Sequence, residues 1–297
     1  MNEDPVLVLQ SNKGDSDVYH YQQEISSYMS NVGDSLKGIL YYPAGFDPLK
    51  KYPMVVHVYE KQNQYANQYL QPTYKNDLGF NIRLFVENGY FVYLPDLVVE
   101  KDGPGIGALN CLHNAMDALT EHSIDLSKVG LIGHSFGGYE TNFIATHSKR
   151  FQAYVSGSGQ SDILQGYHSF NYNFLFPDYK RIETGQYHLP QSFYTNKTLY
   201  FDNNPIYYAE NVNAPVLLWT GTDDLNVPMT QTMSFYNALK RNNKMVIALF
   251  YKNEKHSLKN PNAQIDLTNR ILEWFNYFLK GKHYEWIDVE MQTNASR

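Results

Sequence analysis

The alternation of strand-like and helix-like segments is the feature that most constrains the fold of this chain. Short apolar runs, rich in β-branched or aromatic residues, predict strands at 36–42, 54–59, 90–94, 129–132, 151–156, 216–220 and 245–251. Helical patterns lie between the later runs, at 106–121, 137–148, 229–241 and 263–279. Such an alternation predicts an α/β fold, with a mainly parallel central sheet flanked by helices on both faces. The first two runs, joined by a proline-containing loop, are expected to form a hairpin.

One long segment interrupts this alternation. Residues 160–211 separate two predicted strands that a simple strand–helix–strand unit would join with far fewer residues. The segment contains 13 Phe or Tyr among its 52 residues, a quarter, whereas aromatic residues make up 15% of the whole chain. We interpret it as an aromatic-rich, cap-like insertion before the strand at 216–220, with its own small core and an inner wall that could contribute to a substrate pocket.

Composition excludes several classes of protein. The chain carries 24 basic and 30 acidic residues, a net charge of −6 without a basic block, which argues against nucleic acid and anionic membrane surfaces as partners. No apolar run approaches the roughly 20 residues of a membrane span, and residues 1–10 lack the pattern of a signal peptide. The single cysteine, Cys111, excludes an internal disulfide and a cysteine-built metal site. We therefore expect neither a metal nor a cofactor.

Residues 133–137 read Gly-His-Ser-Phe-Gly, a G-x-S-x-G sequence with Ser135 at its centre. An apolar strand-like run precedes it and a helical pattern follows it. A serine on such a sharp strand-to-helix turn has strained backbone geometry, and side chains two residues before and after it would collide, so both positions need glycine. Ser135 is therefore the candidate nucleophile. The N–H groups at the start of the following helix are candidate donors to a developing negative charge.

A serine in this setting needs an acid and then a base, in that order along the chain. Asp223 and Asp224 both follow the predicted strand at 216–220, and we select Asp224, three residues past Gly221, with Asp223 as a turn-capping residue. Of the ten histidines, His256 stands between the last predicted strand and the last long helix. The sequence therefore predicts a triad of Ser135, Asp224 and His256.

With these residues in place, the chain resembles the catalytic α/β-hydrolase domain of the prolyl oligopeptidase family of serine peptidases, especially the bacterial members of its dipeptidyl-peptidase branch. The resemblance rests on GILYYPAGFDPLKKYPMVVHVYE (38–60), GHSFGGYET (133–141), GTDDLNVP (221–228) and YKNEKHS (251–257). The doubled glycine followed by Tyr139 is more specific than G-x-S-x-G alone. By position, the resemblance implies the same nucleophile, acid and base.

The resemblance also implies further site residues. Tyr59, after an early core strand, would donate its hydroxyl to the oxyanion together with the backbone N–H of Phe136. Asn226 would contact a substrate carbonyl, and Val227 and the Phe136 side chain would line a proline-sized pocket. The chain departs from the family pattern at Glu60-Lys61, where many members have small residues.

Family members usually carry an N-terminal β-propeller that covers the site. The 35 residues before residue 36 are fewer than the roughly 40 of a single propeller blade. We therefore expect either a domain of a longer protein or a member without a propeller. We divide the chain into an arm or linker at 1–35, a catalytic domain at 36–287 containing the insertion at 160–211, and a tail at 288–297.

The predicted function is the hydrolysis of short peptides through a Ser-Asp-His triad and an acyl-enzyme. An esterase or other acyl hydrolase on the same fold, and a non-catalytic module that needs a propeller, are the alternatives. The expected partner is a peptide substrate. The sequence leaves open the residue preferred at the cleavage site, including proline or a small residue, and the choice between endopeptidase and dipeptidyl exopeptidase. It also leaves open a homodimer and the compartment: periplasmic or secreted for a piece of a longer precursor, cytoplasmic for a whole chain.

Overall fold

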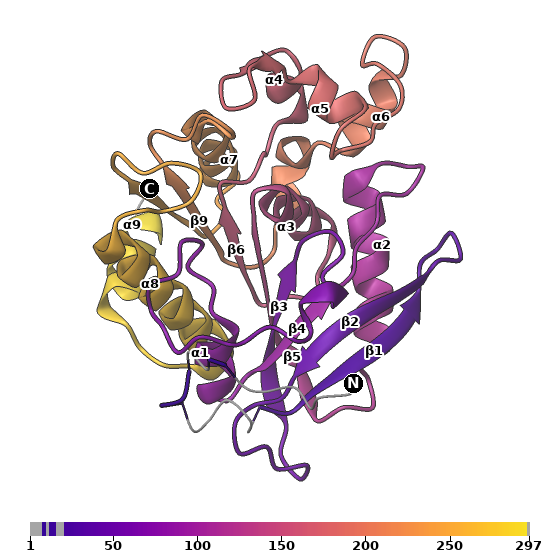
Figure 1. Cartoon of the computed structure of the whole chain (residues 1–297). Helices are drawn as coiled ribbons and strands as arrows, with labels where there is room; N and C mark the ends of the chain where they lie inside the picture. The colour runs from indigo at the N-terminus through magenta and orange to yellow at the C-terminus, as the bar shows by residue number, and fades with distance from the viewer. Residues whose placement is uncertain (1–7, 10–11, 16–20, 296–297) are drawn as a thin grey trace.

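A computed structural model describes residues 8–9, 12–15 and 21–295, with side chains as far as residue 291. Within these residues an eight-stranded sheet has the order β1-β2-β4-β3-β5-β6-β9-β10 (Figure 1). The strands are β1 (Gln23–Met29), β2 (Ser35–Tyr41), β3 (Tyr52–Val58), β4 (Phe91–Pro95), β5 (Ile124–His134), β6 (Ala153–Gly157), β9 (Val216–Gly221) and β10 (Val246–Tyr251). All pairs from β4 to β10 are parallel, and β2 is antiparallel to both β1 and β4. The predicted α/β class with a mainly parallel sheet is confirmed.

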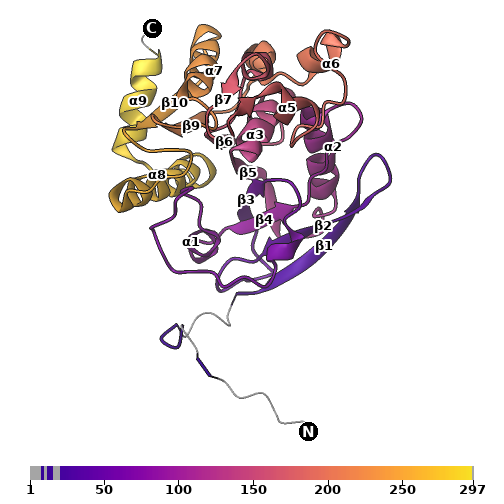
Figure 2. The ribbon, with the colours of Figure 1, turned by 45° about the horizontal axis from the view of Figure 1, so that its top comes forward.

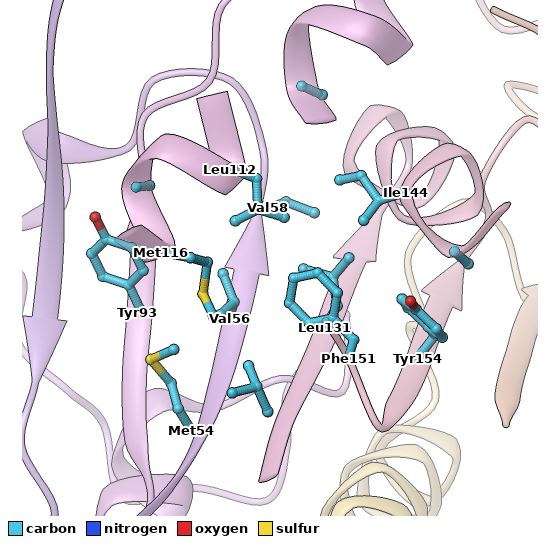
Figure 3. Close-up of a cluster of buried hydrophobic side chains, with 14 of the residues drawn as sticks. Met54, Val56, Val58, Tyr93, Leu112, Met116, Leu131, Ile144, Phe151 and Tyr154 are labelled. Carbon is cyan, nitrogen blue, oxygen red and sulfur yellow. The ribbon is translucent and has the colours of Figure 1, made fainter. Parts of the chain in front are cut away.

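Helices cover both faces of this sheet, as Figures 1 and 2 show. One face is covered by α2 (Pro104–Asp117), α3 (Phe136–His147) and α7 (Met229–Arg241), and the other by α1 (Ile82–Glu87), α8 (Pro261–Lys280) and α9 (Glu285–Ala295). Along each strand, the side chains enter the two cores alternately because successive side chains point to opposite faces of the sheet. In β3, Met54 and Val56 pack with Leu112 and Ile144 on the first face (Figure 3), whereas Val55 packs with Phe275 on the second.

The longest helix illustrates how local sequence signals set the ends of these elements. At the start of α8, Pro261 occupies the first turn, and the side chain of Asn260 accepts a hydrogen bond from the N–H of Asn262. At its end, Gly281 adopts a left-handed conformation with φ 66°, which favours glycine and stops the helix. No helix in the described part of the chain combines the length and apolar character that crossing a membrane requires.

The structure differs from the sequence prediction at the N-terminal edge of the sheet. The expected hairpin between the first two runs does not form: β2 pairs with β1 and β4, and β3 lies between β4 and β5. The residues of β3 are largely buried on both faces, which suits a central strand rather than an edge hairpin. The turn from β1 to β2 contains Gly33 at φ 90°.

Both expected domain limits, at residues 36 and 288, fall within regular secondary structure. Strand β1 lies inside the 1–35 segment, so a boundary at residue 36 divides a β-hairpin. At the other end, α9 begins before residue 288 and continues into the expected tail as far as residue 295, while its Ile287 is buried in the second core. Residues 1–7, 10–11 and 16–20 of the expected arm, and 296–297 of the expected tail, lie outside the described residues.

Residues 160–211, which we call the cap, leave the sheet after β6 and return at β9. They form α4 (Ile163–Tyr167), the short antiparallel pair β7 (Phe170–Asn171) and β8 (Phe176–Pro177), α5 (Tyr179–Glu183), α6 (Lys197–Asp202) and the 3₁₀ segment η3 (Pro205–Asn211). Figure 1 shows the cap helices above the carboxyl ends of the strands. The cap core packs onto α3, where Phe136 and Tyr139 contact Tyr187, Ile182 and neighbouring cap residues.

Side chains from the sheet layer hold both ends of the cap. At its start, Gln231 of α7 accepts hydrogen bonds through Oε1 from the N–H groups of Ser161 and Asp162, at 2.9 and 2.8 Å. Near its end, Asn203 accepts a hydrogen bond through Oδ1 from the N–H of Gly105, at 3.0 Å. These bonds fix the cap relative to α7 and α2.

Candidate active site

Ser135 lies at the turn between β5 and α3, in the geometry that the G-x-S-x-G spacing predicts. Its backbone has φ 60° and ψ −117°, a strained conformation for a residue other than glycine. A Cβ added to Gly133 would collide with the carbonyl oxygen of Gly137, and a Cβ added to Gly137 would collide with that of Val58. Glycine at both positions therefore lets β5, β3 and α3 approach closely enough to expose the serine between them.

The structure brings Ser135, His256 and Asp224 together from three loops at the same edge of the sheet. His256 follows β10, and its Nε2 lies 2.8 Å from the Oγ of Ser135. Its Nδ1 lies 2.7 Å from Oδ2 of Asp224, in the loop after β9. With Nδ1 donating to the carboxylate, Nε2 is free to accept the serine proton. The adjacent Asp223 is exposed and accepts a hydrogen bond from the Thr222 hydroxyl.

Asp224 uses its two carboxylate oxygens for different purposes. Oδ2 accepts from His256, whereas Oδ1 accepts the N–H groups of Asn226 and Val227, at 2.8 and 2.9 Å. The side chain is completely buried. The acid loop therefore wraps around the carboxylate and fixes its rotation.

His134, the residue before the serine, also contacts the base. It donates a hydrogen bond through Nε2 to the carbonyl oxygen of His256, at 2.7 Å, and its ring stacks on Trp219 with centroids 5.2 Å apart. Burial, together with the neighbouring His256 ring, lowers the pKa of His134 to about 3. A neutral His134 adds no positive charge beside a histidine that must itself become protonated.

Tyr59 and the N–H of Phe136 lie beside the serine. The half-buried Tyr59 follows β3, and its Oη accepts a hydrogen bond from Nε2 of Gln186 in the cap, at 3.2 Å. This bond leaves the hydroxyl hydrogen of Tyr59 available to a further acceptor. Burial raises the pKa of Tyr59, so the hydroxyl stays protonated. Phe136 is the first residue of α3, and its N–H has no acceptor within the helix.

A cavity of about 940 Å³ opens at this point. Ser135, His256, Tyr59 and Asn226 line it on the hydrolase side. The cap contributes the opposite wall, with Phe174, Phe176, Lys180, Arg181 and Gln186 among its members. The volume lies in the range of small-molecule and peptide pockets.

Asn226 lines the cavity beside Ser135, whereas Val227 does not. Asn226 lines the cavity, and its Oδ1 accepts a hydrogen bond from Arg181 of the cap at 2.9 Å. Val227 is buried and does not line this cavity, and neither does the Phe136 side chain, whose ring packs edge-on against Tyr187 of the cap. The expectation that Val227 and the Phe136 side chain form a pocket wall is therefore not met in the cavity beside Ser135. The cap core occupies the side of α3 to which Phe136 points.

Sequence reasoning missed the cap residues that complete the cavity. Tertiary folding brings Arg181 to Asn226 and Gln186 to Tyr59. Arg181 also forms an ion pair with Asp178 at 2.8 Å. The aromatic richness of residues 160–211 was the only sequence signal for this wall. Within the described residues, no group of three or more His, Cys, Asp or Glu side chains could hold a metal ion.

Comparisons with known proteins identify the relatives of this chain. A sequence model of the prolyl oligopeptidase family matches residues 110–282, more than half of the chain. An uncharacterized peptidase, YuxL, of Bacillus subtilis is 24% identical over 260 residues, covering 85% of this chain and 38% of its own. Dipeptidyl-peptidase 5 of Porphyromonas endodontalis is 23% identical over 261 residues, covering 84% of this chain and 36% of its own.

Solved structures with similar folds include an acylaminoacyl peptidase in complex with Z-Gly-Gly-Phe-chloromethyl ketone. Its TM-score is 0.72 at 22% identity, and the match covers 92% of this chain and 44% of that one. A puromycin-hydrolyzing peptidase of Mycobacterium tuberculosis also has a TM-score of 0.72, at 19% identity, with 90% of this chain and 41% of that one covered. The chain therefore spans less than half the length of these relatives.

Proposed function

This chain belongs to the prolyl oligopeptidase family, and from that premise we propose that it is a serine peptidase that hydrolyses short peptides through an acyl-enzyme. The single observation that carries the proposal is the continuous hydrogen-bond chain from Ser135 Oγ through His256 to Asp224. Ser135 and His256, at the start of this hydrogen-bond chain, line a cavity large enough for a short peptide. The family supports the reaction class, and the geometry supports the proposed roles of these residues.

In the proposed reaction, Ser135 Oγ attacks the carbonyl carbon of the scissile bond while its proton passes to Nε2 of His256. Asp224 holds the imidazole with Nδ1–H toward Oδ2 and stabilises the imidazolium that forms. His256 then gives this proton to the leaving amine as the carbon–nitrogen bond breaks. A water molecule, deprotonated by His256, attacks the acyl-enzyme and releases the acid together with free Ser135.

The negative charge on the tetrahedral intermediate needs donors that are already oriented. We assign this role to the N–H of Phe136 and the hydroxyl of Tyr59. The hydrogen bond from Gln186 to the Tyr59 oxygen supports the second assignment because it directs the phenol while leaving its hydrogen free. Donors fixed in advance need no reorganisation as the charge develops.

Labelling with a tagged fluorophosphonate tests the nucleophile. The expected result is a single labelled peptide containing Ser135, with no labelling of a folded Ser135→Ala variant. A folded protein that is not labelled, or one labelled at another serine, would remove the basis of the proposal. Comparing an amide with an ester of the same acyl group then separates a peptidase from an esterase. Amide cleavage that is lost in Ser135→Ala supports the peptidase.

A further inference from the structure

A second cavity, of about 650 Å³, adjoins the first. The two share the cap turn at Thr184, Gly185 and Gln186, so this turn forms part of the wall of each. Half of the other residues that line the second cavity are apolar, and they come from the loop after β4, the start of α2 and the start of α3: Leu97, Val98, Val99, Pro104 and Phe136. Against such walls, any polar group becomes a recognition element for a ligand.

Glu140 is the polar group that lines this cavity from α3. Its side chain is almost completely buried, with 2% of the residue exposed. Within the described part of the chain, its Oε2 has no hydrogen-bond partner. A buried carboxyl oxygen without a partner is unfavourable for folding and is rare in native proteins, so a ligand that donates a hydrogen bond to this carboxyl would stabilise it. The proposed peptidase mechanism does not use Glu140.

A second carboxylate, that of the exposed Glu60, lines the same cavity. Burial, and to a smaller extent Glu60, raise the pKa of Glu140 well above its ordinary value. The other ionisable groups that line the cavity are Lys61 and His188, both exposed. The cavity therefore offers Glu140 as a buried acceptor for hydrogen-bond donors, and the charge of Glu60 at the same cavity favours a positive donor. The apolar walls suit an aliphatic or aromatic stem.

We propose that this second cavity binds a primary ammonium group carried on an apolar stem, with Glu140 as the buried acceptor and Glu60 at the rim. The ammonium could belong to a small amine or to a peptide, and the two sources share this chemistry. The site is distinct from the proposed peptidase centre, and its occupancy can be measured without turnover. Failure of one proposal therefore does not entail failure of the other.

Calorimetric titration of the full chain with n-pentylammonium chloride, and with 1-pentanol as the uncharged control, tests the proposal. We expect the ammonium to bind at least tenfold more tightly than the alcohol. We also expect Glu140→Gln to weaken ammonium binding by roughly tenfold or more, since a hydrogen bond to a charged group has about this effect. Glu60→Gln should weaken it by only about two- to fivefold, because exposed ion pairs contribute little.

The pH dependence provides a second readout. Binding of the ammonium favours the ionised form of Glu140, whose pKa is raised in the empty cavity. Proton release on binding means that affinity increases with pH until the carboxyl is already ionised in the free protein. This increase of ammonium affinity with pH is expected to be absent in Glu140→Gln. It is expected to persist in His188→Asn, a control that keeps a residue tolerant of the φ of 47° at this position.

Thermal unfolding distinguishes a binding role from a structural one. Because the buried carboxyl has an unpartnered oxygen, Glu140→Gln and Glu140→Leu are expected to melt at or above the temperature of the wild type. A lower melting temperature in both variants would indicate a structural contribution and count against the proposal. Equal affinities for pentylammonium and pentanol, or an unchanged affinity in Glu140→Gln, would overturn it.

Competition in the Ser135→Ala protein identifies the source of the ammonium. If leucylglycinamide displaces pentylammonium and N-acetyl-leucylglycinamide does not, the cavity takes the ammonium of a peptide. If neither displaces it, the cavity is a separate site for small amines. Displacement by both peptides to the same extent would show that charge is not recognised, and would refute the proposal.

Discussion

Replacement of Asp224 by asparagine tests whether the two oxygens of this carboxylate have different roles, one binding the acid loop and the other orienting His256. Oδ1 accepts two backbone N–H groups, whereas Oδ2 accepts one hydrogen bond from His256. In Asp224→Asn, the amide oxygen is expected to remain opposite the two N–H groups, since the reverse orientation would face three donors toward one another. The amide NH₂ then points at Nδ1 of His256 and requires that nitrogen to be an acceptor.

This change of tautomer disables the base. With Nδ1 accepting, the imidazole proton resides on Nε2, which then cannot take the proton of Ser135. Loss of the correct tautomer is expected to lower kcat by about 10⁴-fold, equivalent to roughly 5.5 kcal/mol in the activation barrier. The effect on folding is expected to be small, because the two hydrogen bonds to the acid loop are retained.

The assay measures kcat and KM with a chromogenic peptide anilide, alongside the rate of fluorophosphonate labelling at Ser135. Asp223→Asn is the matched control, because Asp223 is adjacent in sequence, exposed, and hydrogen-bonded to Thr222. The control is expected to retain activity within a few-fold of the wild type. The reasoning is refuted if folded Asp224→Asn stays within tenfold of the wild type, or if Asp223→Asn loses as much activity.

Three further predictions follow from other contacts. Tyr59→Phe removes one proposed oxyanion donor and is expected to lower kcat by about 10²–10³-fold with little change in KM; steady-state kinetics that show a KM effect alone would contradict this role. The pKa of about 3 for folded His134 lies below the ordinary value of about 6.5 expected on unfolding, so the unfolded chain takes up a proton that the folded one does not, and stability falls as pH drops through this window. Urea unfolding measures how much the free energy of unfolding decreases from pH 7 to pH 5. This decrease is expected to be smaller by about 2 kcal/mol in His134→Gln than in the wild type, and equal decreases in the two proteins would disprove the assignment. Burial raises the pKa of Cys111 to about 11, so iodoacetamide at pH 8 is expected to label it only after denaturation, and rapid labelling of the native protein would be inconsistent with its buried position.

Local patterns were sufficient to predict the centre of the fold. The apolar runs at 129–132 and 216–220 lie within β5 and β9, and the helical pattern at 229–241 coincides with α7. The two strands have a clear signal because burial on both faces makes them continuous apolar runs, and the helix has one because a single apolar stripe repeats every three to four residues. Strand β1 lacked such a signal, since Gln23–Met29 is mostly exposed and carries its apolar residues at the edge of the sheet.

The residues of the candidate site were predictable where they depend on the chain order of the hydrolase elements, as for Ser135 and His256. Gln186 and Arg181 could not be found in this way. Their positions depend on how the cap folds back across the sheet, and a lone glutamine or arginine in an irregular segment carries no local signature. The same holds for Glu140, whose burial opposite a cavity is a property of the packing of α3 against the cap.

Phe136 links two parts of the molecule that could otherwise behave independently. Its N–H belongs to the proposed oxyanion hole, whereas its ring belongs to the core of the cap. Cooperative units of a protein open locally with different free energies, and the cap has a hydrophobic cluster of its own. Local melting of the cap would therefore loosen the first turn of α3 while the central sheet stays folded. Heat is expected to inactivate such a protein at a temperature below that of global unfolding, with hydrogen exchange in residues 160–211 rising first.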